Sequence, residues 1–140
     1  MQWRKMLLPF SVPILLLVIA LSTVPSAMAQ STYSWGMDCK AASGFEQYGG
    51  YADTVWNWTL NGVSIAGNTS YCGTTGSGTV PSNANGIIAH LYVNQEKCHH
   101  NYYTSQSFNP GSVPRISLKG SCAETLYGTP YSIEATFKLS

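Results

Sequence analysis

Beyond the first 29 residues, hydrophobic and polar positions alternate one by one in several stretches, and no stretch repeats them with the spacing of an α-helix. The alternation predicts strands over residues 33–40, 86–95, 115–122 and 131–139, and two more within 54–65. Loops rich in Gly, Ser and Asn separate them. Six or seven short strands of this kind are typical of an all-β fold, so we expect a small antiparallel β-sandwich, immunoglobulin-like or related.

The immunoglobulin pattern is only half present. Cys39, then Trp56 or Trp58, and then Cys98 occur in the order found in immunoglobulin domains. However, Glu96 stands two residues before Cys98, where those domains place a tyrosine. The sequence therefore predicts a sandwich without assigning it to that family.

The clearest local signal is the Asn-Gly pair at 61–62 between two apolar runs. A type I′ turn needs φ > 0 at both central residues, and Asn-Gly meets this need best. A two-residue loop places Leu60 opposite Val63 and Trp58 opposite Ile65. From this hairpin and the other strands we expect a buried core containing Trp35, Trp56, Trp58, Leu60, Ile65, Leu91, Ile116, Leu118, Ile133 and Phe137.

Two long stretches, 66–86 and 98–114, contain mostly small and polar residues and are predicted to be loops. A loop as long as 66–86 is unusual in a compact domain, which indicates either a function or a hidden short strand. Tyrosine interleaved with Gly, Ser and Asn is favoured in recognition loops. The candidate ligand-binding residues in these stretches are Tyr71, Tyr102, Tyr103 and Phe108. The alternative is that these rings cap the ends of the sandwich without binding anything.

The N-terminal segment has the pattern of a secretory signal peptide. Arg4 and Lys5 form a positive start, an apolar run follows over 6–21, and 27–29 reads Ala-Met-Ala, which fits the cleavage pattern. We therefore expect residues 1–29 to be removed, leaving a single β-sandwich domain over 30–140 and no membrane anchor after cleavage. The expected location is extracellular, or periplasmic in a Gram-negative source. The alternative is an uncleaved membrane anchor.

Four cysteines lie outside the leader, an even number that fits two disulfides in an oxidising compartment: Cys39, Cys72, Cys98 and Cys122. Pairing in sequence order closes the shortest loops and is slightly favoured. This pairing has a geometric weakness. If the strand that ends at Cys98 and the strand that ends at Cys122 were direct antiparallel neighbours, the two cysteines would lie at opposite ends of the pair, too far apart for a bridge. The rival pairing, Cys39–Cys122 with Cys72–Cys98, would tie the two tyrosine-containing stretches together.

Charge excludes one class of partner. Without Arg4 and Lys5, the predicted mature chain has five basic and six acidic residues, a net charge of −1. Nucleic acid binding needs clustered Lys and Arg, so no nucleic acid partner is expected. Asn57 and Asn68 each begin an Asn-x-Ser/Thr pattern, which is a glycosylation site only in a eukaryotic source.

Motifs for chemistry are sparse. The only histidines, His90, His99 and His100, lack metal-ligand spacing, so they are weak metal candidates and we expect no cofactor. No Gly-x-Ser-x-Gly motif is present, and the spacing of the six acids does not bring two of them together. These features favour an exported, non-enzymatic binding or interaction module for a glycan or a protein surface. The alternatives are a small secreted hydrolase and an antimicrobial or toxin-like protein.

Overall fold

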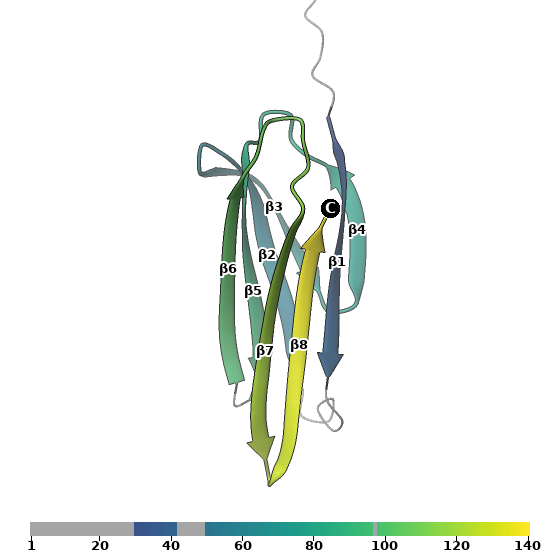
Figure 1. The fold of residues 1–140 in the computed structure, drawn as a ribbon, viewed down its shortest axis with the longest axis vertical. Helices are drawn as coiled ribbons and strands as arrows, with labels where there is room; N and C mark the ends of the chain where they lie inside the picture. Colours follow the sequence, from purple (N-terminus) through teal and green to yellow (C-terminus); the bar gives the residue numbers. More distant parts are fainter. Residues whose placement is uncertain (1–29, 42–49, 97) are drawn as a thin grey trace, which may run out of the picture.

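The computed structural model describes residues 30–41, 50–96 and 98–140, and it confirms the all-β sandwich. Two four-stranded antiparallel sheets pack face to face, in the orders β4-β1-β8-β7 and β3-β2-β5-β6 (Figure 1). The described part of the chain has eight strands rather than six or seven, and it contains no helix that could cross a membrane. The strands are β1 Thr32–Ala41, β2 Tyr51–Leu60, β3 Val63–Tyr71, β4 Thr74–Thr79, β5 Gly86–Gln95, β6 Cys98–Ser107, β7 Ile116–Leu126 and β8 Thr129–Leu139.

Both predicted loops contain strands. Stretch 66–86 holds the end of β3 and all of β4, and stretch 98–114 begins with β6. These strands lie at sheet edges, where each strand has a neighbour on one side only. Their inward positions carry few aliphatic side chains, so no alternation of apolar and polar residues marks them as strands. In β4, for example, the inward positions opposite Trp35 and Tyr33 are Gly76 and Gly78.

The close approach of the Trp35 ring explains the glycine at position 76. A Cβ there would lie 2.3 Å from a carbon of the Trp35 ring. The edge strand therefore provides space in which the ring of the neighbouring strand packs.

The β2–β3 hairpin confirms the predicted turn and corrects the predicted register. Asn61 and Gly62 have φ of 50° and 84°, as a type I′ turn requires, and Leu60 faces Val63. A β-bulge then lets Trp58 face Ala66, so Ile65 is the extra, unpaired residue of β3. The expected pairing of Trp58 with Ile65 was wrong, and Ile65 is 38 % exposed instead of buried.

The core lies between the sheets and contains most of the expected side chains. Trp56, Trp58, Leu91, Ile116, Leu118, Ile133 and Phe137 are buried. Trp35 and Leu60 are only half-buried. The indoles of Trp56 and Trp58 meet edge to face at a centroid distance of 5.5 Å, and Tyr33 packs against both. The aromatic cluster therefore lies between the two sheets, and Trp58 is near the end of β2.

The disulfides pair in sequence order, Cys39–Cys72 and Cys98–Cys122, so the rival pairing was wrong. Cys98 begins β6 instead of ending a strand, and β6 and β7 lie in different sheets, which removes the geometric difficulty. Cys39 and Cys122 lie opposite Ala135 and Ile133 of β8, two residues apart. Both bridges therefore lie toward the same end of the sandwich.

The other end of the sandwich brings the first and last strands together. Ser34 and Ser140 exchange two backbone hydrogen bonds of 2.7 and 2.9 Å. All eight strands lie within the predicted mature domain 30–140, while the predicted leader 1–29 lies outside the described residues.

Candidate functional site

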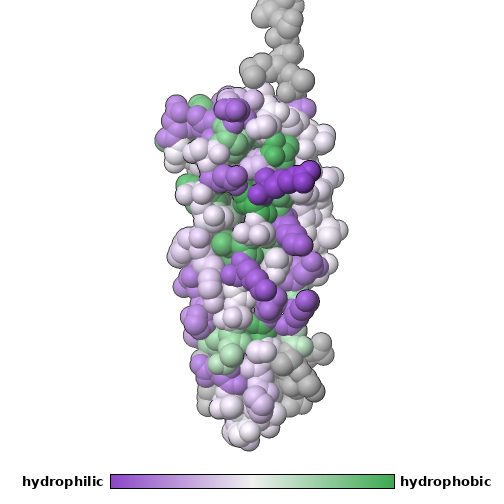
Figure 2. Space-filling view, viewed as in Figure 1, coloured by the Kyte–Doolittle hydropathy of each residue, from purple (hydrophilic) through white to green (hydrophobic). Residues whose placement is uncertain are grey.

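The two outer faces of the sandwich differ in chemistry. Ser, Thr and charged side chains alternate outward along β1, β7 and β8, and an exposed ion pair joins Lys119 Nζ to Glu134 Oε1 at 3.1 Å. Figure 2 shows this face, where hydrophilic side chains spread over the surface and hydrophobic ones appear only in patches between them. The outer face of the sheet β3-β2-β5-β6 instead carries tyrosines and a stacked histidine.

We call this second surface the aromatic face and define it by Tyr51, Asp53, Val55, Tyr71, Ile88, His90, Tyr92, Asn101 and Tyr103. The strand register sets its order, because residues that are direct partners across neighbouring strands point to the same side of the sheet. One row runs Tyr71, Asp53, Tyr92, Asn101, and the next contains Val55, His90 and Tyr103. Tyr51, Tyr71 and Tyr103 are 56, 58 and 67 % exposed, and all three lie on this one face of the sheet.

His90 contacts three other side chains of the aromatic face. Its ring stacks on that of Tyr103 with centroids 3.9 Å apart and planes 23° apart, and the Tyr92 ring lies 3.6 Å away on the same strand. His90 Nε2 also lies 3.3 Å from Asn101 Oδ1, within hydrogen-bond distance. The rings are therefore preorganised by one another, so a ligand that stacks on them orders few side chains on binding.

Asp53 lies in its row between Tyr71 and Tyr92. Its Oδ1 is buried, and within the described residues no hydrogen-bond donor reaches it. Burial raises the pKa of the Asp53 carboxyl, and the charge of His90 partly opposes the rise. The aromatic face thus contains a desolvated acceptor beside an exposed ring.

This raised pKa gives a testable pH dependence. The folded protein binds the Asp53 proton more readily than the unfolded chain, so the group's contribution to stability falls as the pH rises from the ordinary value of 3.8 through the raised value. We expect Asp53→Asn to raise the free energy of unfolding at pH 7, by less than about 1 kcal/mol because solvent screens this partly exposed group. The two proteins should be equally stable at pH 3.

Urea titrations at pH 3 and pH 7 measure this difference. The matched control is Asp38→Asn, an exposed aspartate on the outer face of the other sheet, which should show no such gain. A lower stability of Asp53→Asn at pH 7 would mean that the carboxylate is stabilised in the fold, contrary to the expected direction.

The structure separates the four predicted ligand-binding residues. Tyr71 and Tyr103 lie on the aromatic face, on strands instead of in loops. Tyr102 points inward: its hydroxyl donates to the Ser121 carbonyl at 3.0 Å, and its ring fills the space where Gly120 lacks a Cβ. Phe108 is half-buried against Trp58, with ring centroids 5.8 Å apart. Only the first two therefore share a surface.

Sequence reasoning missed Asp53, His90 and Tyr92 as members of this surface. A signal was present for two of them, because His90 and Tyr92 occupy outward positions of the predicted strand 86–95. Assigning 98–114 to a loop concealed the neighbouring strand β6, and with it the pairing of His90 with Tyr103.

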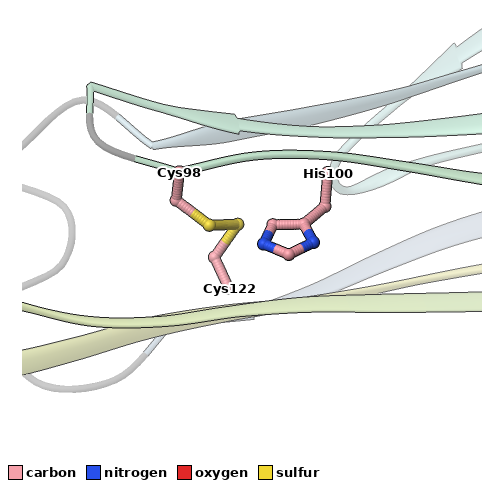
Figure 3. Close-up of side chains that lie close together, drawn as sticks. All are labelled: Cys98, His100 and Cys122. Carbon is pink, nitrogen blue, oxygen red and sulfur yellow. A yellow bond between two sulfur atoms is a disulfide. The ribbon is translucent and has the colours of Figure 1, made fainter.

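The three histidines do not converge. His90 and His99 point outward, and His99 Nδ1 lies 3.0 Å from Asn94 Oδ1. His100 points inward and lies beside the Cys98–Cys122 bridge, as Figure 3 shows. In the described ranges this is the one cluster of three side chains with metal-ligand spacing, but both sulfur atoms are bonded to each other and offer no thiolate. The cluster is a disulfide with a histidine packed against it.

Asp53 lies apart from two other described acidic residues, Asp38 and Glu134, which belong to the other sheet. Asp38 and Asp53 lie on the outer faces of opposite sheets, and Glu134 is paired with Lys119. Comparisons with protein-family models, with curated proteins and with solved structures found no match.

Proposed function

We propose that this protein is an exported, non-enzymatic binding module that recognises a glycan through its aromatic face. The observation that carries the proposal is the pairing of rings with polar groups. Tyr71 lies beside Asp53, Tyr92 beside Asn101, and the strand position opposite Tyr51 is Asn94. A pyranose presents an apolar face edged by hydroxyl groups, and such a pair offers a ring for the face and an acceptor or amide for the hydroxyls.

A protein partner is less well supported. The centre of a protein interface is typically a continuous apolar patch with buried aromatic or arginine anchors. The aromatic face has only two exposed aliphatic side chains, Val55 and Ile88, and polar side chains interrupt its rings. Its composition of stacked rings among amides and one carboxylate suits a ligand rich in hydroxyl groups.

Export is proposed from the leader pattern at 1–29 and is supported by the two disulfides. Disulfides persist mainly in oxidising compartments, and all four cysteines of the chain are paired. An exported module would meet glycans on cell surfaces or in secreted material.

Binding to an array of immobilised polysaccharides and oligosaccharides tests the proposal. We expect Tyr71→Ala to lower the affinity for the bound sugar at least about tenfold, because an exposed aromatic ring is the kind of side chain that dominates binding energy. Tyr127→Ala is the matched control, since Tyr127 is 90 % exposed in the β7–β8 turn, outside the aromatic face. Binding that survives Tyr71→Ala unchanged, or that is lost equally in Tyr127→Ala, would contradict the proposal.

A further inference from the structure

A groove of about 610 Å³ lies at the turn end of the sheet β3-β2-β5-β6. Three segments form it: the β2–β3 turn at 61–62, the start of β5, and the end of β6 with the residues that follow. In Figure 1 this is the upper end of the sandwich, where the chain leaves β6 and crosses to β7. Its volume falls in the range of small-molecule and cofactor sites.

Hydrogen bonds between these segments fix the shape of the groove. The Asn61 backbone N–H donates to Asn85 Oδ1 at 2.8 Å, and Asn85 Nδ2 donates back to Asn61 Oδ1 at 2.9 Å. The Phe108 N–H donates to the Asn85 carbonyl at 3.0 Å. Because Phe108 also packs on Trp58, the wall of the groove rests on the aromatic core.

The lining of the groove is uncharged and mixes polar with apolar side chains. Asn, Gln, Ser and Thr side chains lie beside Ile, Phe and Pro, and no Asp, Glu, Lys, Arg or His occurs among the described residues that line it. A site for a carboxylated or sulfated sugar would need a cation to compensate the buried negative charge. The lining instead suits hydroxyl and amide groups, which exchange hydrogen bonds with neutral side chains.

The groove continues into the aromatic face. Ile88 belongs to both, and its partner on β6, Ser105, lines the groove two residues from Tyr103. From Tyr92 to Gly86 the surface extends about 20 Å, at the usual rise of a strand. An extended ligand could therefore lie along β5 and β6 and contact the groove and the rings together.

We infer that the groove extends the aromatic face and selects an uncharged oligosaccharide long enough to cover both. The inference rests on the proposed glycan-binding function and adds a ligand class and a length requirement to it. Asp53, the carboxylate of the aromatic face, also favours an uncharged ligand, because it repels an anionic sugar.

Calorimetric titration of the purified protein with two sets of oligosaccharides, each from disaccharide to hexasaccharide, tests the inference. The first set contains neutral glucose, mannose and N-acetylglucosamine oligomers, and the second contains galacturonate oligomers. We expect affinity for a neutral series to rise about tenfold or more from disaccharide to hexasaccharide, and the galacturonate series to bind at least about tenfold more weakly.

Ser107 is the position at which to alter the groove without touching the rings. It is exposed, it lines the groove, and its partner Gly86 leaves the neighbouring position without a side chain. Ser107→Leu should remove the affinity gained by the longer neutral oligomers and leave disaccharide binding unchanged. Tyr103→Ala removes an exposed ring of β6 and should weaken all lengths alike. Ser107→Lys should narrow the difference in affinity between neutral and galacturonate hexasaccharides. The control is Ser117→Leu, which alters an exposed serine of the opposite sheet.

The outcomes separate the inference from the function on which it rests. A Ser107→Leu protein that keeps its full preference for long oligomers, or a wild-type protein that binds galacturonate as tightly as neutral sugar, would overturn the inference. Sensitivity to Tyr103→Ala would still support glycan binding in that case. If the wild-type protein binds no oligosaccharide of either set, the proposed function and the inference are both wrong.

Discussion

Replacing Trp58 with alanine is expected to lower the free energy of unfolding by about 3–5 kcal/mol. Trp58 is fully buried, and its indole meets the rings of Tyr33, Trp56 and Phe108 edge to face at 5.3 to 5.8 Å. Alanine loses the transfer free energy of the indole and leaves a cavity that the two sheets can fill only in part. Urea denaturation followed by far-ultraviolet circular dichroism measures the loss.

Trp35→Ala is the matched control for this substitution. Trp35 is only half-buried and packs against the edge strand β4, so its removal should cost clearly less than that of Trp58. A loss below about 1 kcal/mol for Trp58→Ala would contradict the burial of this indole in the core.

The second large effect is expected from removal of the Cys98–Cys122 bridge. The double substitution of both cysteines by alanine should lower the free energy of unfolding by about 3 kcal/mol, because the bridge closes a loop of 24 residues in the unfolded chain. The Cys39–Cys72 bridge closes 33 residues, and chain entropy predicts a loss only about 0.3 kcal/mol larger for its removal. Each double variant is compared with wild type by urea denaturation without reductant.

The comparison between the two bridges tests the mechanism of stabilisation. Nearly equal losses are expected if the bridges act mainly on the unfolded chain. A much larger loss for one bridge would show that it also holds native packing. Both bridges have a neighbour, since His100 lies beside Cys98–Cys122 and the Ala52 carbonyl lies 3.5 Å from Cys72 Sγ. No measurable loss for either bridge would contradict the chain-entropy argument.

The parts of the fold that could be predicted are those that depend only on residues close together in the sequence. The β2–β3 turn was predictable because Asn61-Gly62 meets a backbone requirement that few other pairs meet. The inward faces of β5 and β8 were predictable because their apolar residues alternate without interruption. The bulge at Trp58–Thr59 was not predicted, because the alternation on both sides of the turn fits an unbroken register equally well.

The candidate surface was harder to predict than the core. Tyr71 and Tyr103 were singled out by composition, and each meets its neighbour, Asp53 or His90, across a hairpin of consecutive strands. These contacts were not predicted because the β2–β3 hairpin contains a bulge and β6 was predicted to be a loop. The two hairpins meet through β2 and β5, and register between strands that are not joined by a short turn has no local signal. Composition could therefore indicate a recognition surface, whereas its location on a sheet face required the fold.

The meeting of β1 and β8 at Ser34 and Ser140 determines how the domain responds to mechanical tension. The two strands are antiparallel neighbours, so the start of β1 and the end of β8 lie at the same end of the sandwich. A force that pulls these ends apart loads the hydrogen bonds between the strands one pair after another, so the sheet opens like a zipper instead of resisting in shear. The opening starts at the groove end, and when it reaches Cys39 the bridge to Cys72 still ties β1 to the turn between β3 and β4.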